Sequence, residues 1–211
     1  MVSVLLKDRN LLFVHIPKTG GGSISRVLRR EPDAVVYAVE NMVHAKTCVQ
    51  QLEPRLPKKL SQYQTVAFVR NPWDWAVSGF LHVTQNQPAY QNPPTFKAFL
   101  IGDWRGADWS AYPEKFANPK AYVAYHTQIT QWDHLCANSN RSKVKTVCKY
   151  ERLQKDVRRH LNILSPLPKV NRSDRDHYSR YYDETLIQIV ADRNSDLIDT
   201  YGYDFKREGD H

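Results

Sequence analysis

Short apolar runs alternate with helical patterns along the chain. The first run, residues 11–16, is nearly all apolar and is bounded by turn residues, which is typical of a strand buried on both faces of a sheet. A glycine-rich break follows at residues 17–22, and from Ser23 onward apolar residues recur at the three- and four-residue spacing of one helix face. Similar runs predict further strands at residues 34–39, 65–69 and 144–150.

The later strands also lead into helices. Asn71 and Pro72 follow the third predicted strand, and these residue types favour the N-cap and the first helical position. Apolar residues at steps of four predict a helix from about Glu151, and a last helix is expected to start at Asp183 and to end near Gly202. Strands that alternate with helices indicate an α/β fold with a central, mainly parallel sheet flanked by helices.

Chain length and local amino-acid composition indicate the domain organisation. The 211 residues predict a single domain over 1–211, large enough to fold without a disulfide or a metal staple. Residues 84–119 differ from the rest, because they are rich in Gln, Asn, Pro and Trp and show a helical pattern only at residues 96–100. A long irregular stretch in a compact domain usually carries function, so we expect a lid or a binding loop there.

Charge and cysteine content exclude several classes of protein. The chain carries 30 Lys and Arg against 22 Asp and Glu, a formal net charge of +8 that suits a polyanionic ligand, substrate or surface. The three cysteines form no CxxC pair, so neither a disulfide framework nor a four-cysteine zinc site is expected. No apolar run reaches the ~18 residues of a membrane helix, and the first residues do not read as a signal peptide. We therefore expect a soluble, cytoplasmic protein without an integral membrane segment.

The segment HIPKTGGGS, residues 15–23, carries the first candidate chemistry. Glycines between a buried strand and a helix let the backbone approach a ligand and expose its N–H groups, beside the positive end of the helix dipole. Lys18 precedes the glycines, whereas in the Walker loop of nucleotide hydrolases the lysine follows them and precedes a magnesium-binding Ser or Thr. The spacing favours an anion-binding loop of another kind; the alternative is a plain glycine-rich turn with an exposed lysine.

The segment VRNPWDWAVS, residues 69–78, is the second candidate. Arg70 falls at the carboxyl end of a predicted strand, the edge at which open α/β sheets bind ligands, and Ser78 follows about two turns into the next helix. A guanidinium and a hydroxyl together suit a phosphate monoester, which arginine binds through paired hydrogen bonds. In the alternative interpretation, Arg70 forms a surface ion pair with Asp74 and Ser78 only packs.

Together the two segments resemble a known family, the sulfotransferases that use 3′-phosphoadenosine 5′-phosphosulfate (PAPS). HIPKTGGGS is similar to the family's 5′-phosphosulfate loop, and FVRNPWDWAVSGF is similar to its 3′-phosphate segment. The later runs KYERL and VNRS, at 149–153 and 170–173, extend the resemblance nearly from end to end. The chain most resembles the branch that contains heparan 2-O- and chondroitin-type carbohydrate enzymes and many bacterial relatives. This resemblance implies a P-loop-like, three-layer α/β fold.

The resemblance also implies roles for individual residues. Lys18 would stabilise the negative charge that grows on the bridging oxygen as the sulfuryl group leaves. Arg70 and Ser78 would bind the 3′-phosphate, which distinguishes PAPS from ATP. Arg172 and Ser173, in a basic loop, are candidates for a further phosphate contact, although a solvated charged loop is the alternative. The loop residues that would bind the 5′-phosphate are Lys18, Thr19, Gly20, Gly21, Gly22 and Ser23.

Two positions depart from the family pattern. Gly22 stands where the family usually has Thr or Ser, so one hydroxyl to the 5′-phosphate is either missing or supplied by Ser23. Trp75 stands where a basic residue usually follows the Asp of the second segment. The change at Gly22 bears on the affinity for the cofactor rather than on its identity.

The acceptor hydroxyl needs a general base with a pKa near the working pH, which favours a histidine or a carboxylate. His44 lies just after the second predicted strand, and relatives carry the histidine implicated as their base in a similar segment, so His44 is the candidate base. The alternatives are His15, His82 and Glu40; His15 lies inside a buried strand and is interpreted as a core histidine that holds the loop. No HxH or HExxH pair occurs, so no metal is expected.

The resemblance implies sulfuryl transfer from PAPS to an acceptor hydroxyl on a carbohydrate or polysaccharide, with 3′-phosphoadenosine 5′-phosphate (PAP) as the product. Trp104 and Trp109, in the irregular segment, are candidates for stacking on sugar rings, although core packing explains most tryptophans. Two other functions fit parts of the sequence: an ATP-dependent, kinase-like transferase, and a non-catalytic module that binds polyanions or glycans. No nucleic-acid partner is expected, because no recognition motif is present.

Overall fold

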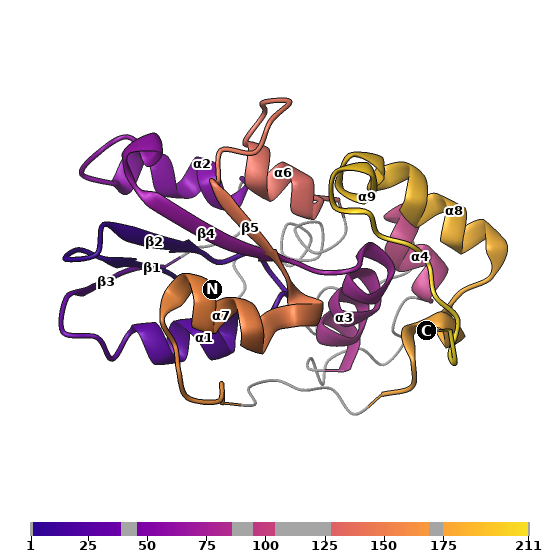
Figure 1. The fold of residues 1–211 in the computed structure, drawn as a ribbon. Coiled ribbons are helices and arrows are strands. Elements are labelled where there is room, and N and C mark those ends of the chain that lie inside the picture. Colours follow the sequence, from indigo (N-terminus) through magenta and orange to yellow (C-terminus); the bar gives the residue numbers. More distant parts are fainter. Residues whose placement is uncertain (1, 39–45, 86–94, 104–127, 169–174, 211) are drawn as a thin grey trace. The chain divides into compact units, whose positions relative to one another are not determined.

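The computed structural model describes residues 2–38, 46–85, 95–103, 128–168 and 175–210 (Figure 1). These residues divide into two compact units, which are described one at a time. The first unit takes the described residues of Met1–Glu40, Lys46–Arg70 and Gln131–Arg172, and the second unit takes the remainder. The single domain expected over 1–211 stays a prediction.

A five-stranded sheet forms the centre of the first unit, with the strand order β3-β1-β2-β4-β5. Strands β2, β4 and β5 run parallel, and β1 pairs antiparallel with both β2 and β3. The strands are β1 (Val2–Leu6), β2 (Leu11–Val14), β3 (Ala34–Ala38), β4 (Gln64–Val69) and β5 (Thr146–Lys149). The α/β class is confirmed, and the sheet is mixed because β1, which the sequence did not predict, joins it through a hairpin to β2.

Helices cover both faces of this sheet, so the first unit has three layers (Figure 1). Helices α1 (Gly21–Leu28) and α7 (Leu153–Leu161) lie on one face, and α2 (Cys48–Leu52) and α6 (Gln131–Cys136) lie on the other. Three short 3-10 turns complete the unit: η2 (Glu53–Arg55), η3 (Leu60–Gln62) and η4 (Tyr150–Arg152).

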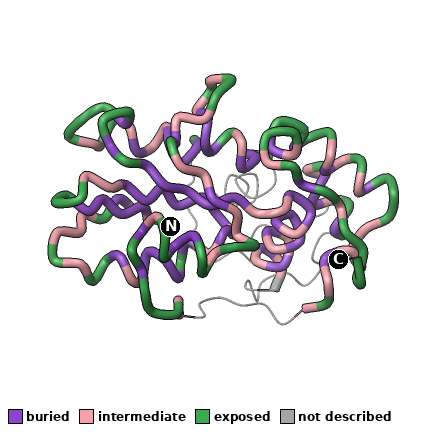
Figure 2. The backbone as a smooth tube through the Cα atoms, viewed as in Figure 1, coloured by how far each residue is buried: buried purple, intermediate pink, exposed green. Residues whose placement is uncertain are grey.

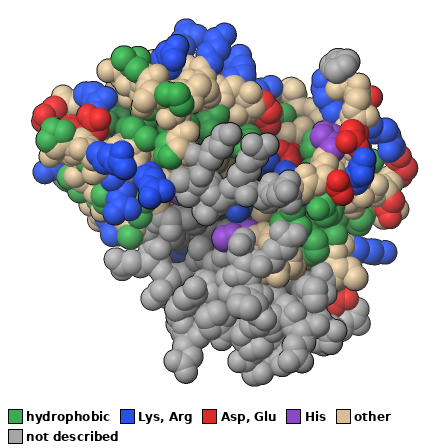
Figure 3. Space-filling view, turned by 90° about the horizontal axis from the view of Figure 1, so that it is seen from below, with side chains coloured by type: hydrophobic (Ala, Val, Ile, Leu, Met, Phe, Trp, Pro, Cys, Tyr) green, Lys and Arg blue, Asp and Glu red, His purple; other side chains and the backbone are tan. Residues whose placement is uncertain are grey.

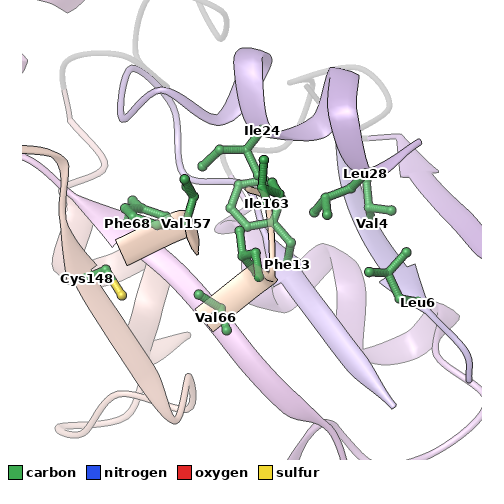
Figure 4. Packing of buried hydrophobic residues seen from close by; sticks show 11 residues of the cluster. Val4, Leu6, Phe13, Ile24, Leu28, Val66, Phe68, Cys148, Val157 and Ile163 are labelled. Carbon is green, nitrogen blue, oxygen red and sulfur yellow. The ribbon is translucent and has the colours of Figure 1, made fainter. Parts of the chain in front are cut away.

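The core of the first unit lies between the sheet and the α1/α7 layer (Figure 4). Phe13 of β2 and Phe68 of β4 are fully buried, and their rings lie 6.5 Å apart. The apolar faces of α1 and α7 pack into the same cluster. Side chains of this size stabilise the fold by roughly 1.5–3 kcal/mol each when fully buried. Figure 2 shows the result: the central strands are buried along their length, whereas the helices expose their outer faces.

The second unit is built from helices around an aromatic cluster. Asn71 Oδ1 caps the first helix by accepting the N–H of Trp73 at 3.1 Å, and Pro72 takes the first helical position, as the sequence predicts. The Trp73 indole packs edge-on against Phe205 at 5.7 Å and donates its N–H to the Ile187 carbonyl at 3.0 Å. The elements are α3 (Pro72–Gln85), α4 (Phe96–Ile101), η5 (Tyr178–Tyr181), α8 (Glu184–Arg193) and α9 (Ser195–Tyr201).

The last predicted helix is divided in two. Asp183 caps α8 by accepting the Leu186 N–H at 2.8 Å, and Gly202 ends α9 in the left-handed conformation, so both predicted ends are confirmed. The break falls at Asn194, whose side-chain amide donates to the Val190 carbonyl at 2.8 Å. None of the helices in the described part of the chain has both the length and the apolarity that crossing a bilayer requires.

Candidate functional site

The glycine-rich loop runs from the carboxyl end of β2 into α1, and its backbone is unusual. Lys18 has a φ of 60° and Gly20 a φ of 82°, both in the left-handed region. A non-glycine residue in that region costs on the order of 1–3 kcal/mol and persists only where its surroundings impose it, often at functional sites. The turn is fixed by Thr19, which is 1% exposed and donates its hydroxyl to the Ile16 carbonyl at 2.9 Å.

Close packing explains two of the three consecutive glycines. A Cβ on Gly21 would lie 2.2 Å from the His15 ring, so no larger residue fits there without a shift of the ring. A Cβ on Gly20 would lie 2.9 Å from Leu153 and 3.2 Å from the Tyr150 ring, and the φ of Gly20 independently favours glycine. Gly22 is exposed on the first turn of α1. Gly20 and Gly21 are therefore packed closely against neighbouring side chains, whereas Gly22 is exposed to solvent.

The start of α1 is suited to an anion. Its N-cap is Gly20, which has no side chain to accept the first amide N–H groups, and the first turn contains no acidic residue. Uncapped N–H groups and the positive end of the dipole favour a phosphate or sulfate at this position. Ser23, 8% exposed, is the first hydroxyl residue of this helix.

His15 has the surroundings of a core histidine. It is 7% exposed, its Nδ1 lies 3.1 Å from the Val2 carbonyl oxygen, and its backbone N–H donates to Ser3 Oγ at 3.0 Å. Burial lowers the pKa of His15 to about 4. The ring is thus neutral at neutral pH and supports Gly21 of the loop, in line with the role that the sequence assigned to it.

Arg70 reaches the loop from the carboxyl end of β4. Its Nη1 donates to the Lys18 carbonyl at 3.3 Å, and its Cζ lies 4.4 Å from the centre of the Tyr150 ring. The strand register explains this meeting: Val69 of β4 pairs with Lys149 of β5, so Arg70 and Tyr150 leave neighbouring parallel strands side by side. The guanidinium, the Tyr150 ring and the loop therefore come together within the first unit.

The backbone of Arg70 is held by Gln131, a residue that the sequence did not single out. Gln131 is 0% exposed, and its Oε1 accepts the Arg70 N–H at 2.7 Å while its Nε2 donates to the Arg70 carbonyl at 2.8 Å. The side-chain amide thus continues the hydrogen-bonding pattern of the sheet one residue beyond β4. A lone glutamine at the start of a helix has no sequence pattern that reveals such a partner, and Tyr150 was visible only as part of the KYERL run.

Ser78 lies in α3 of the second unit, where it is half-buried. Its predicted contact with the 3′-phosphate stays a prediction. In the same unit Asp74 forms an ion pair with Arg175. The ion pair between Asp74 and Arg70 in the alternative interpretation stays a prediction.

Several predicted residues fall outside the described part of the chain. They are His44, Glu40, Trp104, Trp109, Arg172 and Ser173. The irregular segment 84–119 is described only in part, and its expected helical turn is α4. Among the described residues, no group of three or more His, Cys, Asp or Glu side chains could hold a metal ion.

Comparison with known proteins gives one match. The chain matches a family model described as "Sulfotransferase family" over residues 3–206, nearly its whole length. No curated protein and no solved structure matches it significantly.

Proposed function

The chain belongs to the sulfotransferase family, and on this premise we propose that it transfers a sulfuryl group from PAPS to a hydroxyl of a carbohydrate. The observation that carries the proposal is the meeting of Arg70 with the glycine-rich loop. The uncapped start of α1 suits the 5′-phosphate, and Arg70, 3.3 Å from the Lys18 carbonyl, suits the 3′-phosphate of the same nucleotide. Ser78 is proposed to add a hydroxyl to the 3′-phosphate.

The chemistry follows from where charge develops. In-line transfer forms a bond between the acceptor oxygen and sulfur and breaks the bond from sulfur to the bridging phosphate oxygen, whose negative charge grows in a loose transition state. A lysine beside that oxygen stabilises this charge. Lys18 is proposed for this role. The left-handed backbone conformation at Lys18 and Gly20 determines how the loop turns at this residue.

The acceptor must lose its proton as the new bond forms. His44 is proposed to take this proton, since a histidine has a pKa suited to a general base near neutral pH. The proposed carbohydrate acceptor follows from the sequence resemblance, and Trp104 and Trp109 are proposed to stack on its rings. His15 is not a competing base in this proposal, because burial lowers its pKa to about 4 and its ring supports Gly21.

A thermal-shift comparison of PAP with 5′-AMP tests the nucleotide site. At a hundredfold its Kd, a ligand adds roughly 2.7 kcal/mol of stability, so PAP should raise the Tm by several degrees more than 5′-AMP at equal concentration. Arg70→Gln should remove this difference between the ligands. Arg55→Gln is the matched control, because the Arg55 guanidinium likewise bonds a backbone carbonyl, that of Ala38, and lies over a tyrosine ring, that of Tyr37. Equal shifts from both ligands with the unchanged protein would contradict the proposal.

A further inference from the structure

Helices α1 and α7 turn their outer faces to the same side of the sheet. Ile24 and Leu28 of α1 share one buried cluster with Val157 and Leu161 of α7, as Figure 4 shows for three of these four residues by label. Two helices that bury their inner faces in one cluster present their outer faces to solvent side by side. The solvent face of this layer is therefore one surface made by two helices.

Several exposed basic side chains lie on that surface. Figure 3, which views the molecule from the α1/α7 side, shows groups of Lys and Arg side chains there, with hydrophobic and other side chains between them. We define the α1/α7 basic surface by its six exposed basic residues: Arg26, Arg29, Arg30, Lys155, Arg158 and Arg159. Lys155 and Arg159 lie about one helical turn apart, roughly 5 Å along the axis of α7.

The charges of this surface are not balanced by acidic neighbours. None of the six forms an ion pair with another residue in the described ranges of the chain. Of the acidic side chains beside the two helices, buried Asp156 pairs with Arg152 at 3.6 Å and Glu31 pairs with Arg9 at 2.8 Å, whereas Glu151 is exposed four residues before Lys155. Arg158 donates to the Leu164 carbonyl at 3.3 Å, which leaves its charge in place.

Helix stability explains only part of this arrangement. Arg26, Arg158 and Arg159 lie in the last turns of their helices, where a cation interacts favourably with the dipole. Lys155 lies in the first turn of α7, where the dipole disfavours a positive charge. A set of six like charges also repels itself, a cost that binding of an anionic partner would offset.

We propose that the α1/α7 basic surface binds an extended anionic polysaccharide, as a docking surface separate from the glycine-rich loop. This inference rests on the proposed function, in which each transfer adds a negative charge to a carbohydrate chain. Arginine binds sulfate and carboxylate groups through paired hydrogen bonds. Two adjacent helices carry several arginine side chains along a line rather than at one point, which suits a ligand with many anionic groups. Product that has already been sulfated would thus stay on the enzyme while further hydroxyls react.

Other polyanions fit this surface less well. A helix that lies on a membrane turns its apolar face to the lipid, whereas the apolar faces of α1 and α7 are buried in the core. Single-stranded nucleic acids bind where aromatic side chains stack on the bases, and the sequences of both helices contain no Phe, Tyr or Trp. Charge alone, without lipid insertion or base stacking, is what a sulfated polysaccharide requires.

Direct binding of heparin, as a sulfated polysaccharide probe, tests the inference without relying on catalysis. The variant Arg29→Gln/Lys155→Gln/Arg159→Gln should bind heparin about tenfold or more weakly, with a shallower dependence of Kd on salt, since three exposed charges are removed. Its matched control, Lys58→Gln/Arg141→Gln/Lys145→Gln, removes the same charge from exposed positions outside the two helices and should change the Kd by less than about threefold. In both variants, the thermal shift with PAP should equal that of the unchanged protein, which also shows that they fold.

Three outcomes would overturn the inference. Equal losses in the two triple variants would mean that net charge, not this surface, binds heparin. Tighter binding to anionic vesicles or to duplex RNA than to heparin at matched charge would assign the surface to another partner. Absence of heparin binding by the unchanged protein would refute the proposed role of the α1/α7 basic surface. A failure of PAP binding with heparin binding intact would instead contradict the proposed function and leave the surface standing.

Discussion

The Gln131 side chain holds Arg70 by both backbone groups, with hydrogen bonds of 2.7 and 2.8 Å. These two hydrogen bonds hold the Arg70 backbone at the end of β4. They therefore fix the position of the Arg70 Cα, from which the side chain extends. The Gln131 side chain itself is 0% exposed. Gln131 is thus a positioning residue for the proposed phosphate site, acting through Arg70.

Gln131→Leu should therefore weaken both stability and PAP binding. It removes both hydrogen bonds to the Arg70 backbone, at a cost of about 0.5–1.5 kcal/mol each in the free energy of unfolding. Urea denaturation and a PAP titration of the folded protein measure the two effects separately. The control is Gln154→Leu, which removes an exposed glutamine that likewise bonds two backbone groups, at Ser165 and Leu167. If both variants bind PAP like the unchanged protein, Gln131 has no positioning role.

The Tyr150 ring should contribute to PAP binding through the guanidinium above it. Arg70 Cζ lies 4.4 Å from the ring centre, and an interaction of this kind contributes about 0.5–2 kcal/mol. Tyr150→Leu should thus raise the Kd for PAP by about 2- to 30-fold, whereas Tyr150→Phe, which keeps an aromatic face, should bind nearly as tightly as Tyr150. Isothermal titration measures both. Equal losses with Phe and Leu would show that the face of the ring is not what matters.

The contact between Gly21 and His15 predicts a specific rescue. Gly21→Ala places a Cβ 2.2 Å from the His15 ring and should lower the free energy of unfolding by about 3 kcal/mol. Adding His15→Ala makes room, so the double variant should lose clearly less than the sum of the two single variants. Gly202→Ala is the control: its Cβ meets nothing within 4 Å, and only the positive φ of 60° opposes it. Additive losses in the double variant would refute the contact.

Two buried histidines make stability depend on pH. Burial lowers the pKa of His15 to about 4 and that of His134 to about 3, from 6.5 in the unfolded chain. Below pH 6.5 the unfolded chain binds protons that the native state does not, so the free energy of unfolding should fall by about 1.4 kcal/mol per pH unit for each histidine. The fall begins near pH 6.5 and ends for His15 near pH 4. Urea midpoints between pH 7 and pH 5 measure it.

A substitution at His134 separates the two contributions. His134 Nδ1 accepts the Cys48 N–H at 3.2 Å, and His134→Asn retains an acceptor for it without a titrating ring. The slope of stability against pH should then fall by about half. An unchanged slope would show that His134 is protonated in the native state at these pH values.

The parts of the fold set by local apolar patterns could be predicted from the sequence. The runs at 11–16, 34–39, 65–69 and 144–150 are observed as β2, β3, β4 and β5, and the caps of α3 and α8 follow from Asn71 and Asp183. Strand β1 was missed, because Val2–Leu6 is short and contains a polar residue, Ser3. That residue is 0% exposed, since its Oγ accepts the His15 N–H from the neighbouring strand.

Some residues of the candidate site could likewise be predicted from the sequence, and others could not. The loop glycines, Lys18 and Arg70 are visible in the sequence, because phosphate chemistry needs those residue types after a strand. Gln131 is 61 residues from Arg70, and only the folding of β4 beside α6 brings the two together. Long-range partners of this kind have no local pattern, and the close contact of His15 with Gly21 likewise depends on the observed loop conformation.

Transfer of labelled sulfate from PAPS tests the central claim most directly. The unchanged protein should transfer label to a carbohydrate acceptor. Lys18→Ala should lower kcat by about a hundredfold or more, as the loss of a charge-stabilising group does. PAP should still give a thermal shift with this variant, smaller than with the unchanged protein, because one of the proposed contacts to the 5′-phosphate is lost. Absence of transfer to any hydroxyl acceptor, or full activity in Lys18→Ala, would contradict the account.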